Sequence, residues 1–200
     1  ESYDREHAFG ESEVRLLQTI ASSMGVALEN ARLFEDIRRR TRESAALAEV
    51  GRDITSTLDL ADVMQGIARH AKELLHADNS AIFVPEAEGA SYRAIVALGP
   101  IRPQLEGTVI VPGVGIIGNI IAGRQAEYVN DTARDPRAVQ IAGTDDEDDE
   151  RLMVAPLRAG AESRGAIAVW RTGGQRFTDA DLEFLVGLSL AASVALRNAH

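Results

Sequence analysis

The 200-residue sequence contains no cysteine, which excludes disulfide bonds, thiolate metal sites and cysteine-based catalysis. No run of 18 apolar residues occurs, so the sequence predicts no membrane-spanning helix. Basic residues are outnumbered: 21 Lys and Arg stand against 31 Asp and Glu, and this net charge of -10 argues against a nucleic-acid partner. The sequence also has no secretory signal pattern, and we therefore expect a cytoplasmic location.

Proline is absent from about Glu11 to about Leu58, and this stretch predicts one very long helix. Apolar residues recur along it at alternating spacings of three and four, which is the heptad pattern of a coiled coil. Beyond Phe34 a shifted register fits better, so we expect a change of register near residues 33–37. The predicted seam, through which two copies of the chain would pair, consists of Leu17, Ile20, Met24, Ala27, Ala31, Phe34, Ile37, Leu47 and Ile54.

After a second helix that starts at the predicted N-cap Asp59, the hydrophobic period changes from 3.6 to 2. Alternating segments predict six strands, at about 79–86, 91–99, 107–113, 126–131, 151–160 and 164–172. A short helix is expected within 113–125, and a closing helix follows Thr178, with Asp181 completing a capping box. The order of elements predicts an α+β fold, a six-stranded antiparallel sheet flanked by helices and preceded by the long helix.

The two ends of the chain resemble each other. "VALENA" begins at Val26 and "VALRNA" begins at Val194, and upstream the pair Phe9 and Leu17 corresponds to Phe177 and Leu185 at the same offset. A match at a fixed spacing is typical of modular arrays. We therefore predict that the chain starts in the closing helix of one module and ends in the closing helix of the next.

The segments "GVGIIGNIIAGRQAEYVNDTARDPR" and "RLMVAPLRAGAESRGAIAVWR", followed by the closing helix, resemble the GAF family of small-molecule sensor domains. The resemblance implies a tandem arrangement in a bacterial signalling protein. Residues 1–34 would close a preceding GAF-like domain, 35–58 would form a signalling helix, and 59–199 would form the GAF domain. It also implies a homodimer through the N-terminal and closing helices, and a covalently linked output domain such as a histidine kinase or a nucleotide or diguanylate cyclase.

The resemblance further implies a ligand pocket on the sheet face opposite the helices, under the segment from about Gly113 to Glu150. The acidic run from Asp145 to Glu150 would be a mobile lid over it, because adjacent acids lack the spaced geometry of a calcium loop. From strand and loop positions, the expected pocket residues are Phe83, Ile95, Ile116, Asn130, Thr132, Arg137, Met153 and Trp170.

The ligand itself is left as an unknown small molecule. A cyclic nucleotide stays open, because Phe177 and Asp181 match half of the signature of the nucleotide-binding subgroup, whereas Leu182 replaces its glutamate. Covalent bilin binding and methionine sulfoxide reduction require cysteines in this family, and haem would depend on a helix histidine such as His70 or His76. No catalytic residue and no metal site is predicted, so the chain is interpreted as a sensor and not an enzyme. The competing interpretation is a ligand-free structural module for dimerisation or spacing.

Overall fold

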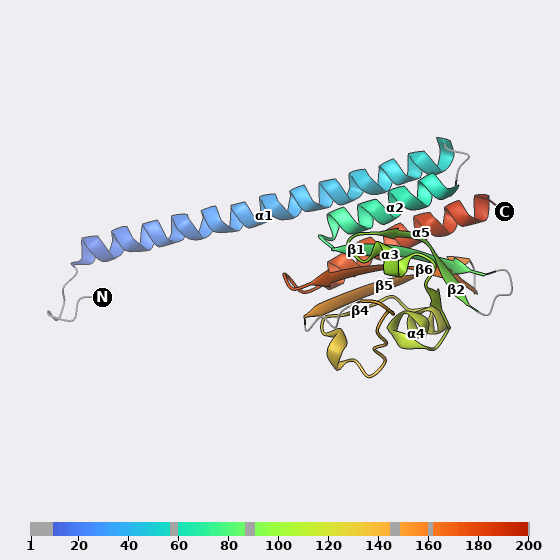
Figure 1. Ribbon diagram of the computed structural model, residues 1–200. Coiled ribbons are helices and arrows are strands. Elements are labelled where there is room, and N and C mark those ends of the chain that lie inside the picture. The colour runs from blue at the N-terminus through green and yellow to red at the C-terminus, as the bar shows by residue number, and fades with distance from the viewer. Residues whose placement is uncertain (1–9, 57–59, 87–90, 145–148, 160–161, 200) are drawn as a thin grey trace. The chain divides into compact units, whose positions relative to one another are not determined.

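The computed structural model describes residues 10–56, 60–86, 91–144, 149–159 and 162–199. The chain divides into two compact units, Glu1–Arg42 and Glu43–His200. From Glu11 on, the first unit belongs to the long predicted helix, α1, which runs over Glu11–Ser56 (Figure 1). The second holds the end of α1 and every other element. The predicted N-cap Asp59 lies outside the described residues.

The second unit has the predicted six-stranded sheet, in which every neighbouring pair is antiparallel. The strands follow the order β3-β2-β1-β6-β5-β4 across the sheet. Their bounds are β1 Asn79–Pro85, β2 Tyr92–Leu98, β3 Val109–Ile110, β4 Glu127–Val129, β5 Glu150–Ala159 and β6 Glu162–Thr172. The fold class predicted from the sequence is confirmed.

Helices α2 (Leu60–Leu74) and α5 (Asp179–Asn198) cover one face of the sheet (Figure 1). Thr178 caps α5, because its hydroxyl accepts from the Asp181 backbone N–H while the Asp181 carboxylate accepts from the Thr178 N–H. The predicted capping box is therefore present. We call this side the helix face; its core includes Met64, Ile67, Ile82, Met153, Ile167, Leu185 and Leu188.

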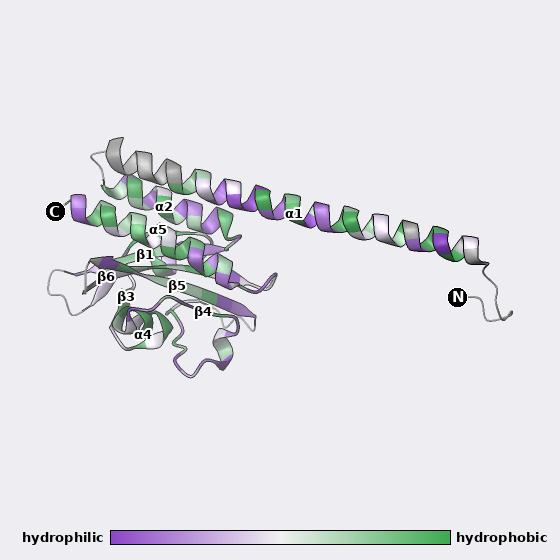
Figure 2. Cartoon of the chain, turned by 180° about the vertical axis from the view of Figure 1, so that it is seen from behind, coloured by the Kyte–Doolittle hydropathy of each residue, from purple (hydrophilic) through white to green (hydrophobic). Residues whose placement is uncertain are grey.

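The opposite side, here called the cavity face, is covered by the short helix α4 (Gly115–Gly123), which is largely hydrophobic in Figure 2. A four-residue helix that the sequence did not predict, α3 (Arg102–Leu105), and the 3-10 turn η1 (Thr132–Arg134) complete this side. Successive strand residues serve opposite faces, since Ile82 belongs to the helix-face core whereas Phe83 belongs to the second core. That second core includes Phe83, Leu105, Ile116, Ile121, Val154 and Trp170.

Along α1, hydrophobic and hydrophilic residues alternate (Figure 2). Within the first unit the predicted seam residues from Leu17 to Ile37 are exposed. The prediction that Leu47 belongs to the dimer seam is corrected. Leu47 lies in the second unit and packs against the helix-face core beside Gly187 of α5 in the same chain. The side chain of Ile54 lies outside the described part of α1.

Candidate ligand cavity

The cavity face contains a cavity of about 790 Å³. This volume lies within the usual range of small-molecule sites, about 300–1,000 Å³. Its walls come from the start of α4, the segment that carries η1, and the beginning of β5, with Trp170 of β6 also lining it. The described lining residues are Ile101, Gln104, Thr108, Val109, Ile110, Val111, Val114, Gly115, Ile116, Ile117, Thr132, Ala133, Ala138, Val139, Gln140, Ile141, Ala142, Thr144, Glu150, Leu152 and Trp170.

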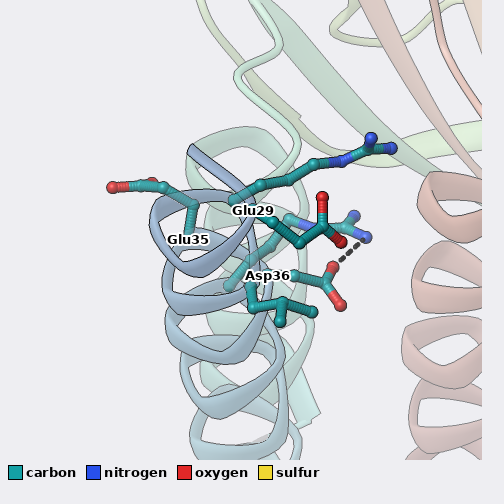
Figure 3. Close-up of a pocket in the computed structure, with 6 residues that line it drawn as sticks. Glu29, Glu35 and Asp36 are labelled. Carbon is teal, nitrogen blue, oxygen red and sulfur yellow. Dashed lines mark ion pairs between the residues drawn. The ribbon is translucent and has the colours of Figure 1, made fainter. Parts of the chain in front are cut away.

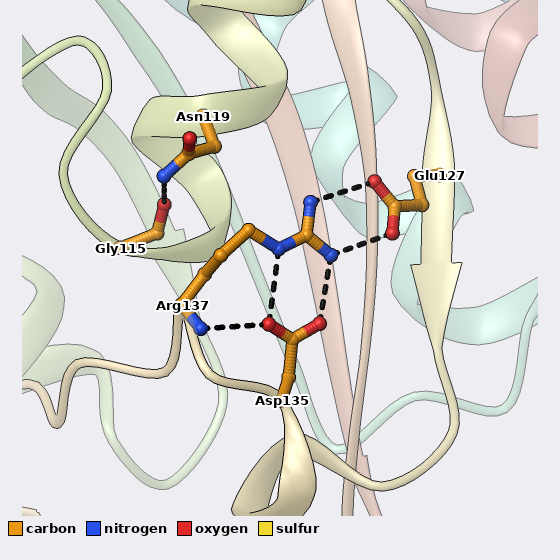
Figure 4. Close-up of polar contacts among 5 residues, drawn as sticks. All are labelled: Gly115, Asn119, Glu127, Asp135 and Arg137. Atoms are coloured by element: carbon orange, nitrogen blue, oxygen red, sulfur yellow. Dashed lines mark hydrogen bonds and ion pairs between the residues drawn. The ribbon is translucent and has the colours of Figure 1, made fainter.

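The glycines of "GVGIIG" shape the edge of the cavity and do not form a phosphate loop. Gly113 and Gly115 have φ angles of +80° and +71°, a backbone region that favours glycine. Gly118 has a different role, because a Cβ atom there would lie 2.2 Å from the carbonyl oxygen of Val111. These residues allow the chain to turn sharply after β3 and bring α4 against the preceding strand. Asn119 reinforces the turn by donating from its amide to the carbonyl of Gly115 at 2.7 Å (Figure 4).

Arg137 fixes the segment that forms the outer wall of the cavity. Its guanidinium donates to both oxygens of Glu127, at 3.0 and 2.6 Å, and to both oxygens of Asp135, at 3.0 and 2.7 Å (Figure 4). These hydrogen bonds hold the pKa of the Asp135 carboxyl below its usual range, although burial opposes that shift. They also raise the pKa of Arg137 above its usual value. The ion pairs join the loop after η1 to strand β4.

The same wall is tied to the start of the closing helix. The Asn130 side chain accepts from the Phe177 backbone N–H at 2.8 Å and donates to the Phe177 carbonyl at 3.0 Å. In addition, the Tyr128 hydroxyl donates to Asp179 in the first turn of α5 at 3.0 Å. A displacement of the wall segment would therefore act directly on the N-terminus of α5.

Three of the eight predicted pocket residues line the cavity: Ile116, Thr132 and Trp170. Phe83 is on the correct face but is fully buried in the second core. Ile95 is 45% exposed and lies outside the cavity. The pairing of β1 with β2 passes from Ile82–Val96 to Phe83–Ala94, so Ile95 is the extra residue of a bulge in β2.

The structure places the other three predicted residues outside the cavity lining. Met153 lies on the helix face, because strand alternation turns it away from Leu152. Asn130 and Arg137 support the wall through the hydrogen bonds described above and are not among the lining residues. Glu150 was predicted as part of the acidic lid, whereas in the structure it begins β5 and lines the cavity together with Leu152.

A second hollow lies on the side of α1 in the first unit (Figure 3). All of its lining residues come from one stretch of the helix, Glu29 to Arg39, and Asp36 forms an ion pair with Arg39 at 3.5 Å. Since a single helix surface cannot enclose a ligand, we assign no binding role to it.

Other chemistry considered for the sequence is not assembled in the described residues. They contain no group of three or more His, Asp or Glu side chains arranged to hold a metal ion. His70 is buried on α2, which covers the helix face, and neither it nor His76 lines the cavity. No helix among them has the length and apolar character needed to cross a bilayer. Most of the proposed acidic lid, residues 145–148, falls outside the described part of the chain.

The fold and the cavity together define a class of protein: an α+β domain whose antiparallel sheet carries helices on one face and a ligand-sized cavity on the other. The GAF domain family model matches residues 59–198, and the chain belongs to that family.

Solved structures with the same fold come from several kinds of protein. The chain is similar to the GAF domain of a phosphoenolpyruvate-protein phosphotransferase from Coxiella burnetii, with a TM-score of 0.71, 16% identity, and coverage of 80% of this chain and 95% of that one. It resembles residues 122 to 287 of a methyl-accepting chemotaxis protein, with a TM-score of 0.64, 18% identity and coverage of 75% and 96%. It also resembles the free methionine-R-sulfoxide reductase of Neisseria meningitidis in complex with its substrate, with a TM-score of 0.67, 16% identity and coverage of 78% and 89%.

Proposed function

We propose that this GAF domain is a regulatory sensor that binds a small molecule in the cavity between α4, the η1 segment and β5. The observation that supports this proposal is the cavity itself, about 790 Å³ and lined mainly by apolar side chains with a few polar groups. A reductase role does not suit the chain, because the thiol chemistry expected of such a family member requires cysteine and the sequence has none. The signalling proteins among its structural relatives agree with a regulatory role.

In this proposal the signal leaves the cavity through its outer wall. Ligand contacts with Thr132 or Ala138 would shift the segment that Arg137 and Asn130 hold. Because Asn130 is bonded to Phe177 and Tyr128 to Asp179, the shift would reach α5 and then a covalently linked output domain. Small movements of helices at an interface are a known way to pass such a signal.

We also propose that the chain forms a homodimer through α1 and α5. Met24 of the predicted seam is 67% exposed, and Val186 and Leu190 present apolar side chains on the outer side of α5. The substitution Met24→Glu is expected to weaken dimerisation, measured by analytical ultracentrifugation. Val26 is similarly exposed but points away from the seam by helical periodicity, so Val26→Glu is the matched control and should leave the dimer intact. Equal effects of the two changes would contradict the proposed seam.

The sensor proposal is tested by thermal melting with a panel of cyclic nucleotides, nucleobases, carboxylates and amines. A ligand at 100 times its dissociation constant stabilises the folded state by about 2.7 kcal/mol. This corresponds to a rise in the melting temperature of roughly 5–10 °C for a chain of this size. Ala138 lines the cavity and is exposed, so Ala138→Trp should fill the cavity and abolish the shift without unfolding the domain.

The matched control is Ala122→Trp, which adds the same side chain at an exposed α4 position outside the cavity. It should preserve the ligand-dependent shift. A panel that gives no shift would favour the ligand-free spacer. A shift that survives Ala138→Trp would mean that the ligand binds outside this cavity and would contradict the proposed site. A cyclic nucleotide that gives the largest shift would instead support the nucleotide-binding alternative.

A further inference from the structure

The charge of the cavity lining indicates what kind of ligand fits it. Glu150 is the single ionisable side chain among the described lining residues, and no Lys, Arg or His belongs to that set. Glu150 begins β5 and shares a sheet face with Leu152, which is paired across the strands with Trp170. The lining of one cavity therefore contains both a carboxylate and the only tryptophan in the chain. A carboxylate beside an aromatic ring is suited to a cation.

The neutral polar groups of the lining add hydrogen-bond acceptors. Thr108 and Thr144 donate their hydroxyl protons to the backbone carbonyls of Gln104 and Ile141. Thr132 donates to the backbone and side-chain oxygens of Glu150, both at 3.2 Å. The hydroxyl oxygens of these threonines keep lone pairs that can accept from a ligand.

The side chain of Gln104 also favours a ligand that donates a hydrogen bond. Its amide nitrogen donates to the carbonyl of Gly143 at 3.3 Å. Its Oε1 atom is buried and accepts no hydrogen bond within the described residues. A buried acceptor without a donor costs about 1–3 kcal/mol, so a ligand that supplies an N–H would be favoured there.

The start of α4 is the one feature of the lining that favours an anion. Its first backbone N–H groups carry the positive end of the helix dipole, which is equivalent to about half an elementary charge. Glu150 adds a carboxylate to the same lining, which opposes this preference.

We propose that the ligand of this cavity is an organic amine that is protonated at neutral pH and carries an apolar body. This inference rests on the proposed sensor function. The ammonium group would donate to the Glu150 carboxylate and to the hydroxyl oxygen of Thr132, which lies 3.2 Å from a carboxylate oxygen of Glu150. The apolar body would lie against Trp170 and the apolar residues at the start of α4, such as Ile116.

Three probes of nearly equal size test the inference: 2-phenylethylammonium, 2-phenylethanol and phenylacetate, which are a cation, a neutral alcohol and an anion. Each is titrated into the full chain while the indole N–H signal of Trp170 is followed by ¹⁵N NMR. Because the chain has one tryptophan, that signal reports on the cavity alone. We expect the cation to bind most tightly and the anion most weakly.

The substitution Glu150→Gln removes the charge and preserves the shape of the side chain. It should weaken binding of the ammonium probe by roughly tenfold or more, because hydrogen bonds to charged groups contribute about 1.5–3 kcal/mol. Its effect on the neutral alcohol should be less than about threefold. Glu106→Gln is the matched control, since Glu106 is exposed and outside the cavity, and it should leave the affinity for all three probes unchanged.

The possible outcomes separate the two proposals. Tighter binding of phenylacetate or of the alcohol, or an ammonium affinity that Glu150→Gln leaves unchanged, would overturn the amine inference while the cavity still binds ligands. No saturable shift of the Trp170 signal with any of the three probes would overturn the amine inference alone, because the proposed sensor function is decided by the thermal-melting panel and the Ala138→Trp variant.

Discussion

The two faces of the sheet are built from the same six strands and yet differ in what covers them. On the helix face, two long helices close over a continuous apolar core in which Leu185 and Leu188 are fully buried. On the cavity face, a nine-residue helix and irregular segments leave about 790 Å³ unfilled. Close packing stabilises the helix face, whereas the cavity face has fewer apolar contacts where the cavity lies and has space for a ligand. Under the proposed function, stability and binding would therefore be separated across one sheet.

The largest loss of stability is expected from a substitution on the helix face. Leu185→Ala removes a fully buried side chain between α5 and the sheet and should lower the free energy of unfolding by about 2–5 kcal/mol. Urea denaturation followed by circular dichroism measures this loss. The folded fraction should bind probes in the cavity with unchanged affinity. A loss below about 1 kcal/mol would show that this face is not the main source of stability.

The next largest loss of stability is expected where α4 packs on the cavity face. A Cβ atom in Gly118→Ala would meet the backbone of Val111 at 2.2 Å, so α4 must move. We expect a loss of about 1–3 kcal/mol in urea denaturation and weaker binding in the cavity. Gly123 lies in the same helix with no atom within 4 Å of its added Cβ, so Gly123→Ala is the control and should be neutral or slightly stabilising. Identical results for both glycines would contradict the role given to Gly118.

A smaller effect is expected at the ion pairs of the cavity wall. Arg137→Gln should reduce the free energy of unfolding by about 1 kcal/mol near neutral pH, because partial exposure screens these pairs. The folded-state pKa of Asp135 is lowered, so its contribution is present above the unfolded-state pKa of about 3.9 and is lost as the pH falls through the lower folded value. The difference between wild type and variant should therefore be constant from about pH 5 to 8 and decrease below about pH 4. A difference that persists unchanged at pH 2 would contradict this origin.

The smallest effect tests the boundary of the cavity. Ile95 was predicted to lie in the pocket, but the structure exposes it outside the cavity. Ile95→Ala should change the free energy of unfolding by no more than about 0.5 kcal/mol and leave probe binding unaltered. Thermal melting and the Trp170 titration check both statements. A clear loss of affinity would mean that the site extends to β2.

The elements of the fold were predictable because they depend on local patterns. Strand alternation, the long proline-free helix and the pairing of Thr178 with Asp181 each leave a direct mark in the sequence. The family resemblance supplied the location of the cavity, under the segment between Gly113 and Glu150. The missed helix α3 has only four residues, too few to show a period.

The individual site residues were harder to predict, because their positions depend on register and on long-range pairing. Ile95 is the unpaired residue of a bulge in β2 and lies outside the cavity. Strand alternation places Leu152 and Glu150 of β5 in the cavity lining and the expected Met153 on the helix face. Asn130 was predicted to line the pocket, whereas its side chain is bonded to the backbone of Phe177, 47 positions away. A sequence does not display such contacts between distant segments.

The separation of the two faces is tested most directly by one NMR titration that observes both at once. The indole N–H of Trp170 reports on the cavity face, and the methyl groups of Met64 and Met153 report on the helix face. With 2-phenylethylammonium as the probe, we predict a saturable shift of the Trp170 signal and much smaller shifts of both methionine methyl signals. An unperturbed Trp170 signal, or methionine signals that shift as much as the indole, would contradict the account.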